Sequence, residues 1–147
     1  MDLGRIAKLG IISADKCYYE PEKGERLSGI LKEILILRFG TVYEINGFWQ
    51  GKEERSFGVF PFGQNDETIL IALAKVFKQN SIIVGSKLLD CTSYKIIDAP
   101  YESASKLEII TFEAGKPKPE NYSSIESENT SFAFVFPEEE KKEEVGK

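Results

Sequence analysis

The sequence contains no histidine, and its only cysteines are Cys17 and Cys91. A closed structural zinc site takes four Cys or His ligands, which two cysteines do not supply. Serine and cysteine hydrolases use histidine as their base, so only a lysine- or carboxylate-assisted variant of that chemistry is left. The two cysteines have no CxxC spacing, and we expect them to be reduced thiols.

Motifs for phosphates, membranes and export are missing as well. The chain has no Walker A loop and no GxGxxG, and Gly47 to Gly51 has neither the spacing nor the following helix of such a motif. No apolar run approaches the roughly 20 residues of a membrane helix. Residues 1–14 lack the pattern of a secretory signal. We therefore expect a cytoplasmic protein with no cofactor and no membrane association.

Positive charge is scarce, because 19 Lys and Arg residues stand against 24 Asp and Glu, a net charge of -5. Proteins that bind nucleic acid through its phosphates present a basic surface, so we expect no nucleic-acid partner. The last eleven residues, 137–147, contain five Glu and three Lys and predict an acidic disordered tail. An acidic surface favours a protein partner with a basic face.

Core-forming residues are plentiful in the rest of the chain. Hydrophobic residues make up 41% of the sequence and aromatic residues 12%, which is typical of a folded domain rather than a disordered segment. A length of 147 residues suits one domain, and we expect residues 1–136 to form it. Within this domain, residues 113–130 are rich in Lys, Pro, Glu, Asn and Ser and predict a mobile loop.

Hydrophobic periodicity predicts the elements of the domain. Apolar residues recur at helical spacing over 27–35 and 69–77, with Gly40 after the first helix and Asn65 or Asp66 capping the second. Short apolar or alternating runs predict strands, and the run with one wetter face, 41–46, is expected at a sheet edge. The predicted strands cover residues 10–14, 41–46, 56–60, 81–84, 94–97, 107–112 and 132–136.

The first six of these elements follow the order strand, helix, strand, strand, helix, strand. Right-handed crossovers around a tight hairpin turn this order into a split βαβ arrangement. The sequence therefore predicts an α+β fold with a ferredoxin-like core (β-α-β-β-α-β). Additional C-terminal β-strands are expected to extend its sheet or to cover the open face.

Short motifs run through residues 10–84: Ile-Ile-Ser-Ala at 11–14, a glycine hairpin at 47, Glu-Arg-Ser-Phe at 54–57 and Phe-Lys-Gln-Asn-Ser-Ile at 77–82. With the two leucines of the first helix (31 and 35), they resemble a loose family of small uncharacterised phage and bacterial proteins. The resemblance covers about half of the chain. It implies a phage or mobile-element context and brings no assigned activity.

Serine residues mark three of the predicted strand ends. In the predicted order, strand one ends at the sheet edge where strands three and four begin, so Ser13, Ser56 and Ser81 are expected to converge. Glu54 and Gln79 lie at the same edge. Hydroxyl, amide and carboxylate groups in one place favour hydrogen bonding to a nucleotide, a sugar or a peptide. The same residues also suit a structural role, because such groups often satisfy backbone donors and acceptors.

Aromatic residues suggest one further contact. Trp49 lies in the hairpin loop, which suits either an exposed hot spot for a protein partner or a ring folded back onto the sheet. Phe132, Phe134 and Phe136 alternate along the last strand. They predict core rather than an RNA-binding platform, because basic residues do not accompany them.

Acidic residues allow a second hypothesis. Asp15, Glu20 and Glu22 could ligate Mg²⁺ together with Glu54, since that ion needs only one or two carboxylates besides substrate oxygens. The same acids also suit solvated loops. They support an alternative function, a metal-dependent phosphodiesterase or nuclease that uses Asp15 and Glu54.

The sequence favours a small non-enzymatic binding module of phage or mobile-element origin. Such a module would engage a host protein or sequester a small polar ligand such as a nucleotide. The hypothesised partner contact is Trp49. The hypothesised ligand-binding residues are Ser13, Glu54, Ser56, Gln79 and Ser81.

Overall fold

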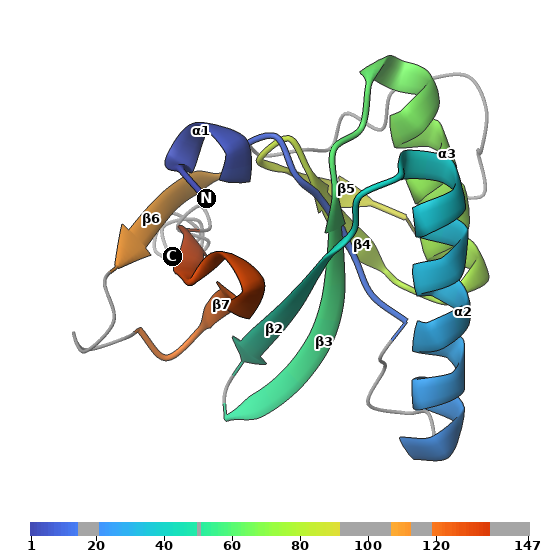
Figure 1. Ribbon diagram of the computed structural model, residues 1–147, viewed down its shortest axis with the longest axis horizontal. Helices are drawn as coiled ribbons and strands as arrows, with labels where there is room; N and C mark the ends of the chain where they lie inside the picture. The colour runs from blue at the N-terminus through green and yellow to red at the C-terminus, as the bar shows by residue number, and fades with distance from the viewer. Residues whose placement is uncertain (15–20, 50, 92–106, 113–118, 136–147) are drawn as a thin grey trace, which may run out of the picture.

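A computed structural model of the protein describes residues 1–14, 21–49, 51–91, 107–112 and 119–135, with the backbone alone for Pro21 and Trp49 (Figure 1). Its helices are α1 (Leu3–Ile6), α2 (Pro21–Phe39), α3 (Gly63–Val76) and the 3-10 turn η1 (Glu126–Glu128). Its strands are β1 (Gly10–Ile12), β2 (Tyr43–Trp49), β3 (Lys52–Val59), β4 (Ser81–Val84), β5 (Lys87–Asp90), β6 (Glu108–Phe112), β7 (Tyr122–Ile125) and β8 (Thr130–Val135).

These strands form one antiparallel sheet in the order β5-β4-β1-β3-β2-β7-β8-β6. The long helices α2 and α3 lie side by side against one face of the sheet (Figure 1). The sheet curls away from them into a half-barrel, and α1 lies at one end of its concave side. The expected mixture of helices and strands is therefore present.

The expected ferredoxin-like core with added strands is wrong. The sheet is a single curled layer of eight antiparallel strands, and β2 is not its edge, because β7 pairs with residues 46–48 of β2. An alternating strand offers backbone donors and acceptors on both sides. The alternation at residues 41–46 therefore could not show that β2 has a second neighbour. It also could not show that the sheet continues beyond β2 and curls.

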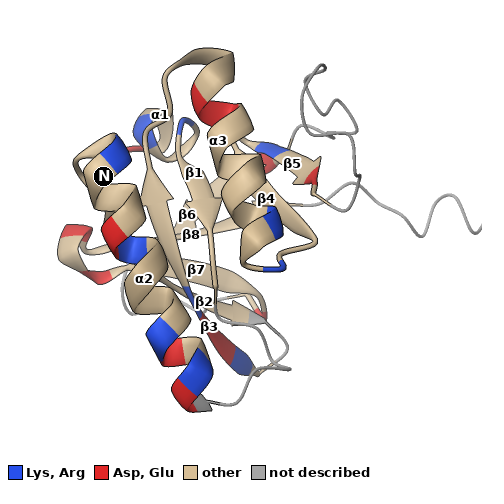
Figure 2. Ribbon diagram, turned by 90° about the vertical axis from the view of Figure 1, so that its right-hand side faces the viewer, with Lys and Arg blue, Asp and Glu red and all other residues tan. Residues whose placement is uncertain are grey.

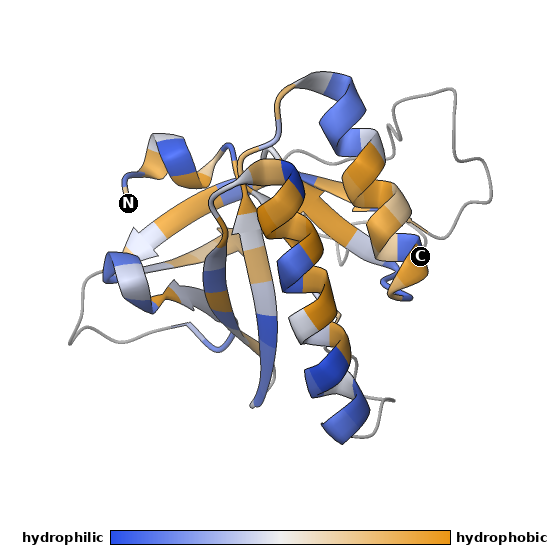
Figure 3. Cartoon of the chain, turned by 45° about the vertical axis from the view of Figure 1, so that its right-hand side comes forward, coloured by the Kyte–Doolittle hydropathy of each residue, from blue (hydrophilic) through white to orange (hydrophobic). Residues whose placement is uncertain are grey.

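The helices and the sheet enclose the larger of two hydrophobic cores. Leu31 and Leu35 of α2 and Leu70 of α3 are fully buried in it, as is Phe57 of β3. The predicted stripe on the second helix is wrong at Val76, which is exposed. Figure 3 shows that the first turns of α2 are hydrophilic and that its hydrophobic residues begin farther along the helix.

The start of α3 differs from the predicted cap. Asn65 and Asp66 lie inside the first turns of the helix, which begins at Gly63 after an extended Phe62. The carboxylate of Asp66 accepts a hydrogen bond from the Phe62 backbone N–H at 2.7 Å and another from Nη2 of Arg38 at 2.6 Å. Asp66 therefore reaches back to the helix start, as in a capping box, and ties α3 to the last turn of α2.

The concave side of the sheet has a core of its own beneath α1. Side chains alternate between the two faces of a strand, so Ile45 of β2 and Phe132 of β8 point to this side. They pack with Ile6 and Leu9 from the N-terminal segment, and all four are buried. The predicted burial of Phe132 is confirmed, whereas Phe136 lies outside the described residues.

The two ends of the curled sheet approach each other close to α1. The backbone N–H of Leu107, just before β6, donates to the carbonyl of Ser86 in the β4–β5 turn at 2.7 Å. The Ser86 hydroxyl donates in turn to the carbonyl of Ala7, just after α1, at 3.1 Å. These contacts, made by the buried residues Ser86 and Leu107, hold the half-barrel together at the end that contains the second core.

Other sequence predictions have mixed outcomes. Residues 122–125, within the predicted loop at 113–130, form the strand β7. The predicted strand at 94–97 and the predicted tail at 137–147 lie outside the described residues. None of the helices in the described ranges is long and apolar enough to cross a membrane.

Candidate functional site

A cavity of about 450 Å³ lies on the concave side of the sheet, next to the core beneath α1. Its walls combine strands from both halves of the curled sheet with the residues that follow α3. Its apolar lining includes Ile11, Ile83, Leu88 and Phe134. Among the described residues, its polar lining consists of Ser13, Glu54, Ser56, Gln79, Ser81, Asn121, Tyr122 and Ser123. All five residues of the hypothesised ligand site are therefore in one place.

The register of the sheet explains why the serines meet. The β1–β3 and β1–β4 ladders, continued past the end of β1, place Ser13 opposite both Ser56 and Ser81. Opposite residues of antiparallel strands share a face, with Cβ atoms about 5 Å apart. The three serines thus form a row across neighbouring strands. Their predicted convergence is confirmed, and ligand binding by them stays a prediction.

Ser13 and Gln79 are hydrogen-bonded to each other at the inner wall of the cavity. The Ser13 backbone N–H donates to Oε1 of Gln79 at 3.3 Å, and its hydroxyl donates to the Arg55 carbonyl at 2.6 Å. Gln79 is aimed at β1 because Lys78 adopts a left-handed φ of 60° and the Gln79 N–H folds back to the Ala74 carbonyl, at 2.7 Å. Both side chains therefore bond to backbone groups, which is the structural role that the sequence suggested for them. Both also line the cavity.

Glu54 lies at the solvent side of the cavity. It is an exposed residue of β3 and pairs with Gly47 of β2, which pairs on its other side with Ser123 of β7. A Cβ atom on Gly47 would lie 3.4 Å from the Glu54 carbonyl oxygen and 3.9 Å from Oγ of Ser123. The missing side chain of Gly47 therefore keeps space between the two polar residues.

Aromatic rings lie on the other face of these strands, because Phe48 and Tyr122 alternate with Gly47 and Ser123. Phe48 stacks on Tyr122 with ring centroids 4.7 Å apart, and Phe112 meets Tyr122 edge to face at 5.7 Å. Asn121, Tyr122 and Ser123 were not predicted as site residues, because residues 113–130 have the composition of a loop. The four-residue strand Tyr-Ser-Ser-Ile is too short for its alternation to reveal a strand.

Other residues of the two hypotheses fall partly outside the described chain. Asp15, Glu20 and the side chain of Trp49 are not among the described residues, and Glu22 is exposed in the first turn of α2. Within the described ranges, no three His, Cys, Asp or Glu side chains group as a metal site would require. The Asp15–Glu54 pair of the nuclease hypothesis therefore stays a prediction.

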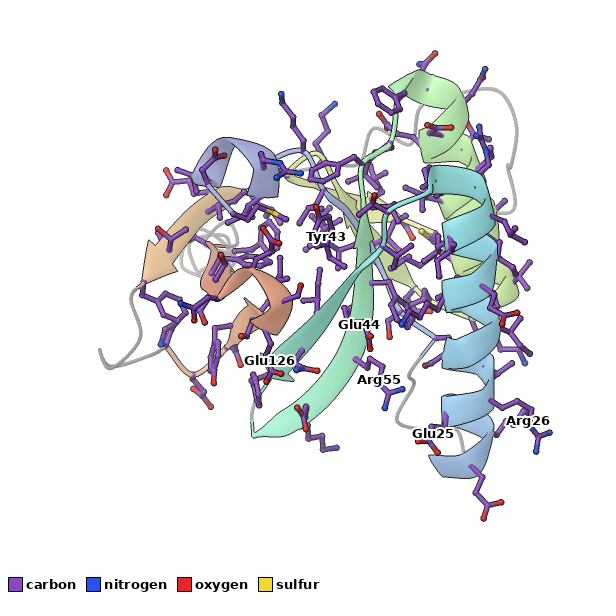
Figure 4. The ribbon with its side chains drawn as sticks, viewed as in Figure 1. Glu25, Arg26, Tyr43, Glu44, Arg55 and Glu126 are labelled. Atoms are coloured by element: carbon purple, nitrogen blue, oxygen red, sulfur yellow. The ribbon has the colours of Figure 1, made fainter. Side chains whose placement is uncertain are left out.

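The outer surface mixes charges and carries a few large apolar side chains. Figure 2 shows acidic and basic residues interspersed along α2 and at the β2–β3 hairpin. Glu44 points toward α2 (Figure 4), where Nζ of Lys32 lies 2.9 Å from its carboxylate. Leu37 of α2 and Phe62 before α3 are 88% and 84% exposed. A partner docking on this side would find apolar contacts within a surface of mixed charge.

No known protein-family model matches the chain, and no curated protein is significantly similar to it. The resemblance to phage and bacterial proteins at residues 10–84 therefore stays a prediction. The functional argument rests on the geometry and chemistry of the cavity.

Proposed function

We propose that the protein is a small non-enzymatic binding module that sequesters a small polar ligand in the cavity of its curled sheet. The observation that carries this proposal is the convergence of Ser13, Ser56, Ser81 and Gln79 on one cavity with an apolar wall. Ligand sites are typically concave and of about 300–1,000 Å³, largely apolar and with a few converging polar groups. Closed sheets of about eight strands can hold a single small ligand in this way.

The arrangement of the serines supports binding rather than catalysis. A nucleophilic serine needs a base within hydrogen-bonding distance. The Ser13 hydroxyl donates instead to the backbone carbonyl of Arg55. Among the described lining residues the serines are accompanied by no Lys, His or Cys, so a base there would have to be the carboxylate of Glu54.

Engagement of a host protein is the second candidate. Leu37 and Ile30 lie seven residues apart on α2, hence on one side of the helix, and are 88% and 46% exposed. Exposed apolar side chains of this kind often mark contacts with other proteins. A phage or mobile-element origin and a cytoplasmic location belong to the same proposal, and the sequence resemblance and composition support them.

Recovery of the bound ligand tests the proposal. The protein is purified without denaturant, unfolded in organic solvent, and the released small molecules are identified by mass spectrometry. Ser81→Trp should lose the ligand, because Ser81 is an exposed lining residue that can carry an indole into the cavity. Ser127→Trp, in the exposed turn η1, is the matched control and should retain it.

Adding the recovered compound back gives the quantitative result. A ligand that binds only the folded state stabilises it by about 2.7 kcal/mol at a hundredfold excess over Kd. Wild type and Ser127→Trp should show this gain, and Ser81→Trp should not. Equal gains in all three proteins, or none, would contradict binding in the cavity.

A further inference from the structure

We infer that Gln79 and Ser56 select the ligand of the cavity by donating hydrogen bonds to a carbonyl oxygen on an otherwise apolar molecule. This inference rests on the proposed binding function and adds the residues and the ligand group that decide specificity. It follows from the hydrogen bonds that the two side chains leave unmade, from their burial, and from the apolar wall beside them.

One half of the Gln79 amide group is bonded and the other half is open. Its Oε1 accepts a hydrogen bond from the Ser13 backbone N–H at 3.3 Å. Only the oxygen of an amide can accept from an N–H, so this bond fixes the orientation of the group. Within the described part of the chain, the NH₂ group of Gln79 donates to no acceptor. It is therefore a donor that a ligand can use.

Ser56 provides the second open group. Its neighbour across the continued β1–β3 ladder, Ser13, donates its hydroxyl to the Arg55 carbonyl. The third serine of the row, Ser81, is exposed and can bond to water. The Ser56 hydroxyl has no hydrogen-bond partner in the described ranges. Ser56 is therefore the one serine of the row that is both buried and unbonded.

Both open groups face the cavity. Gln79 is 8% exposed and Ser56 is 9% exposed, and both line the cavity. Among the described residues, no fully enclosed side-chain nitrogen or oxygen atom lacks a hydrogen-bond partner. The open groups of Gln79 and Ser56 are therefore still accessible from the space that they line. An unpaired donor is costly once a ligand displaces its water, so a ligand that supplies an acceptor is favoured.

A single ligand oxygen can serve both groups. Ser13 lies between them, because its backbone N–H bonds to Gln79 and its Cβ stands about 5 Å from that of Ser56. An NH₂ group only donates, whereas a hydroxyl can donate or accept. A carbonyl oxygen has two lone pairs and can accept one hydrogen bond from each side chain. The carbonyl of an amide, a ketone or a nucleobase meets this requirement.

The apolar wall takes the rest of the ligand. Ile11 and Phe134 line the cavity and also pack against the buried core beneath α1, which supports their positions. Ile83 and Leu88 pair across β4 and β5 and extend the same apolar surface. An analogue without the carbonyl would fill this space but leave the Gln79 NH₂ group unpaired. Sites built around a hydrogen bond reject such analogues strongly.

Two probes of the same shape test the role of the oxygen: benzamide, and thiobenzamide, whose sulfur accepts hydrogen bonds more weakly. Their affinities for the full chain are measured by NMR titration of the backbone amides and of the side-chain NH₂ signals of Gln79. Thiobenzamide should bind at least about fivefold more weakly than benzamide, as expected when a hydrogen bond is weakened. The NH₂ protons of Gln79 should shift downfield with benzamide, because they gain an acceptor.

A matched pair of variants assigns the effect to the open NH₂ group. Gln79→Glu keeps an oxygen for the Ser13 N–H and replaces the NH₂ group by a second oxygen. It should weaken benzamide at least about fivefold and abolish the preference over thiobenzamide. Asn80→Asp makes the same change at the next residue, which is exposed and does not line the cavity, and should alter neither affinity.

Ser56→Ala tests the second donor independently. It removes only a hydroxyl and leaves the bond between Ser13 and Gln79 in place. It should weaken benzamide about two- to tenfold, the usual effect of losing one neutral hydrogen bond. This variant decides the point even where Gln79→Glu unfolds the protein.

The outcomes separate this inference from the proposed function. Thiobenzamide binding as tightly as benzamide at Ser13, Ser56 and Ser81 would overturn the inference and leave the binding site standing. Equal effects of Gln79→Glu and Asn80→Asp, or an unchanged affinity of Ser56→Ala, would also overturn it. Cavity signals that respond to neither probe would overturn the proposed function and the inference together.

Discussion

At the scale of single residues, Gly58 of β3 lies in close contact with the core beneath α1, on the concave side of the sheet. A Cβ atom there would stand 2.9 Å from Cδ1 of Ile45 and 3.2 Å from Cδ2 of Leu9. Both neighbours are buried and have little room to withdraw. Gly58→Ala should therefore lower the free energy of unfolding by about 1–3 kcal/mol, the usual range for overpacking. Urea denaturation at constant pH measures it.

Gly29 provides the opposite case and the control. It lies on an exposed turn of α2, and nothing stands within 4 Å of its added Cβ. Gly29→Ala should stabilise the protein by about 0.5–1 kcal/mol, because alanine loses less backbone entropy in a helix. A Gly58→Ala protein as stable as Gly29→Ala would show that the core beneath α1 is packed less tightly than these contacts indicate.

Ser13 and Ser81 belong to the same row of serines, but their substitution by alanine should change the stability of the protein by different amounts. The buried Ser13 hydroxyl donates to the Arg55 carbonyl at 2.6 Å, whereas Ser81 is exposed. Ser13→Ala should cost about 0.5–1.5 kcal/mol, because the hydrogen bond of the buried Ser13 hydroxyl is lost. Ser81→Ala should stay within about 0.5 kcal/mol of wild type. Thermal unfolding of the two variants side by side decides the point, and equal melting temperatures would contradict it.

At the scale of elements, Asp66 joins the start of α3 to the end of α2. Its carboxylate is 8% exposed and serves both the Phe62 N–H and the Arg38 guanidinium. Asp66→Ala should cost about 1–3 kcal/mol, since it removes both bonds. Arg38→Ala should cost less, because that side chain is 47% exposed and the helix start keeps its own bond. Urea denaturation compares the two, and the reverse order would contradict this account of the junction.

The elements with long regular patterns were predictable. The helices around Leu31 and Leu70 and the strand around Phe57 follow from hydrophobic periodicity. The strands β5 and β7 were not predicted, because four residues carry too little periodicity to identify a strand. The cap of α3 was misplaced because Asp66 bonds backward from inside the helix, a contact that depends on tertiary structure.

At the scale of the whole molecule, the convergence of Ser13, Ser56 and Ser81 was predictable and the curl of the sheet was not. The serines meet because of pairings among β1, β3 and β4. The curl depends on which strand pairs with the second side of β2, and on the bond between Leu107 and Ser86. Alternation along a strand does not specify its neighbours. The part of the cavity wall that β7 and β8 contribute could therefore not be predicted from the sequence.

A chemical-shift map of the binding of the recovered ligand tests the central claim most directly. The backbone amide signals of the full chain are assigned, and their changes at saturation are mapped onto the structure. The account predicts the largest changes at Ser13, Ser56, Ser81 and Gly47, around the cavity on the concave side of the sheet. Changes confined to the outer side of α2, around the exposed Leu37, would contradict it.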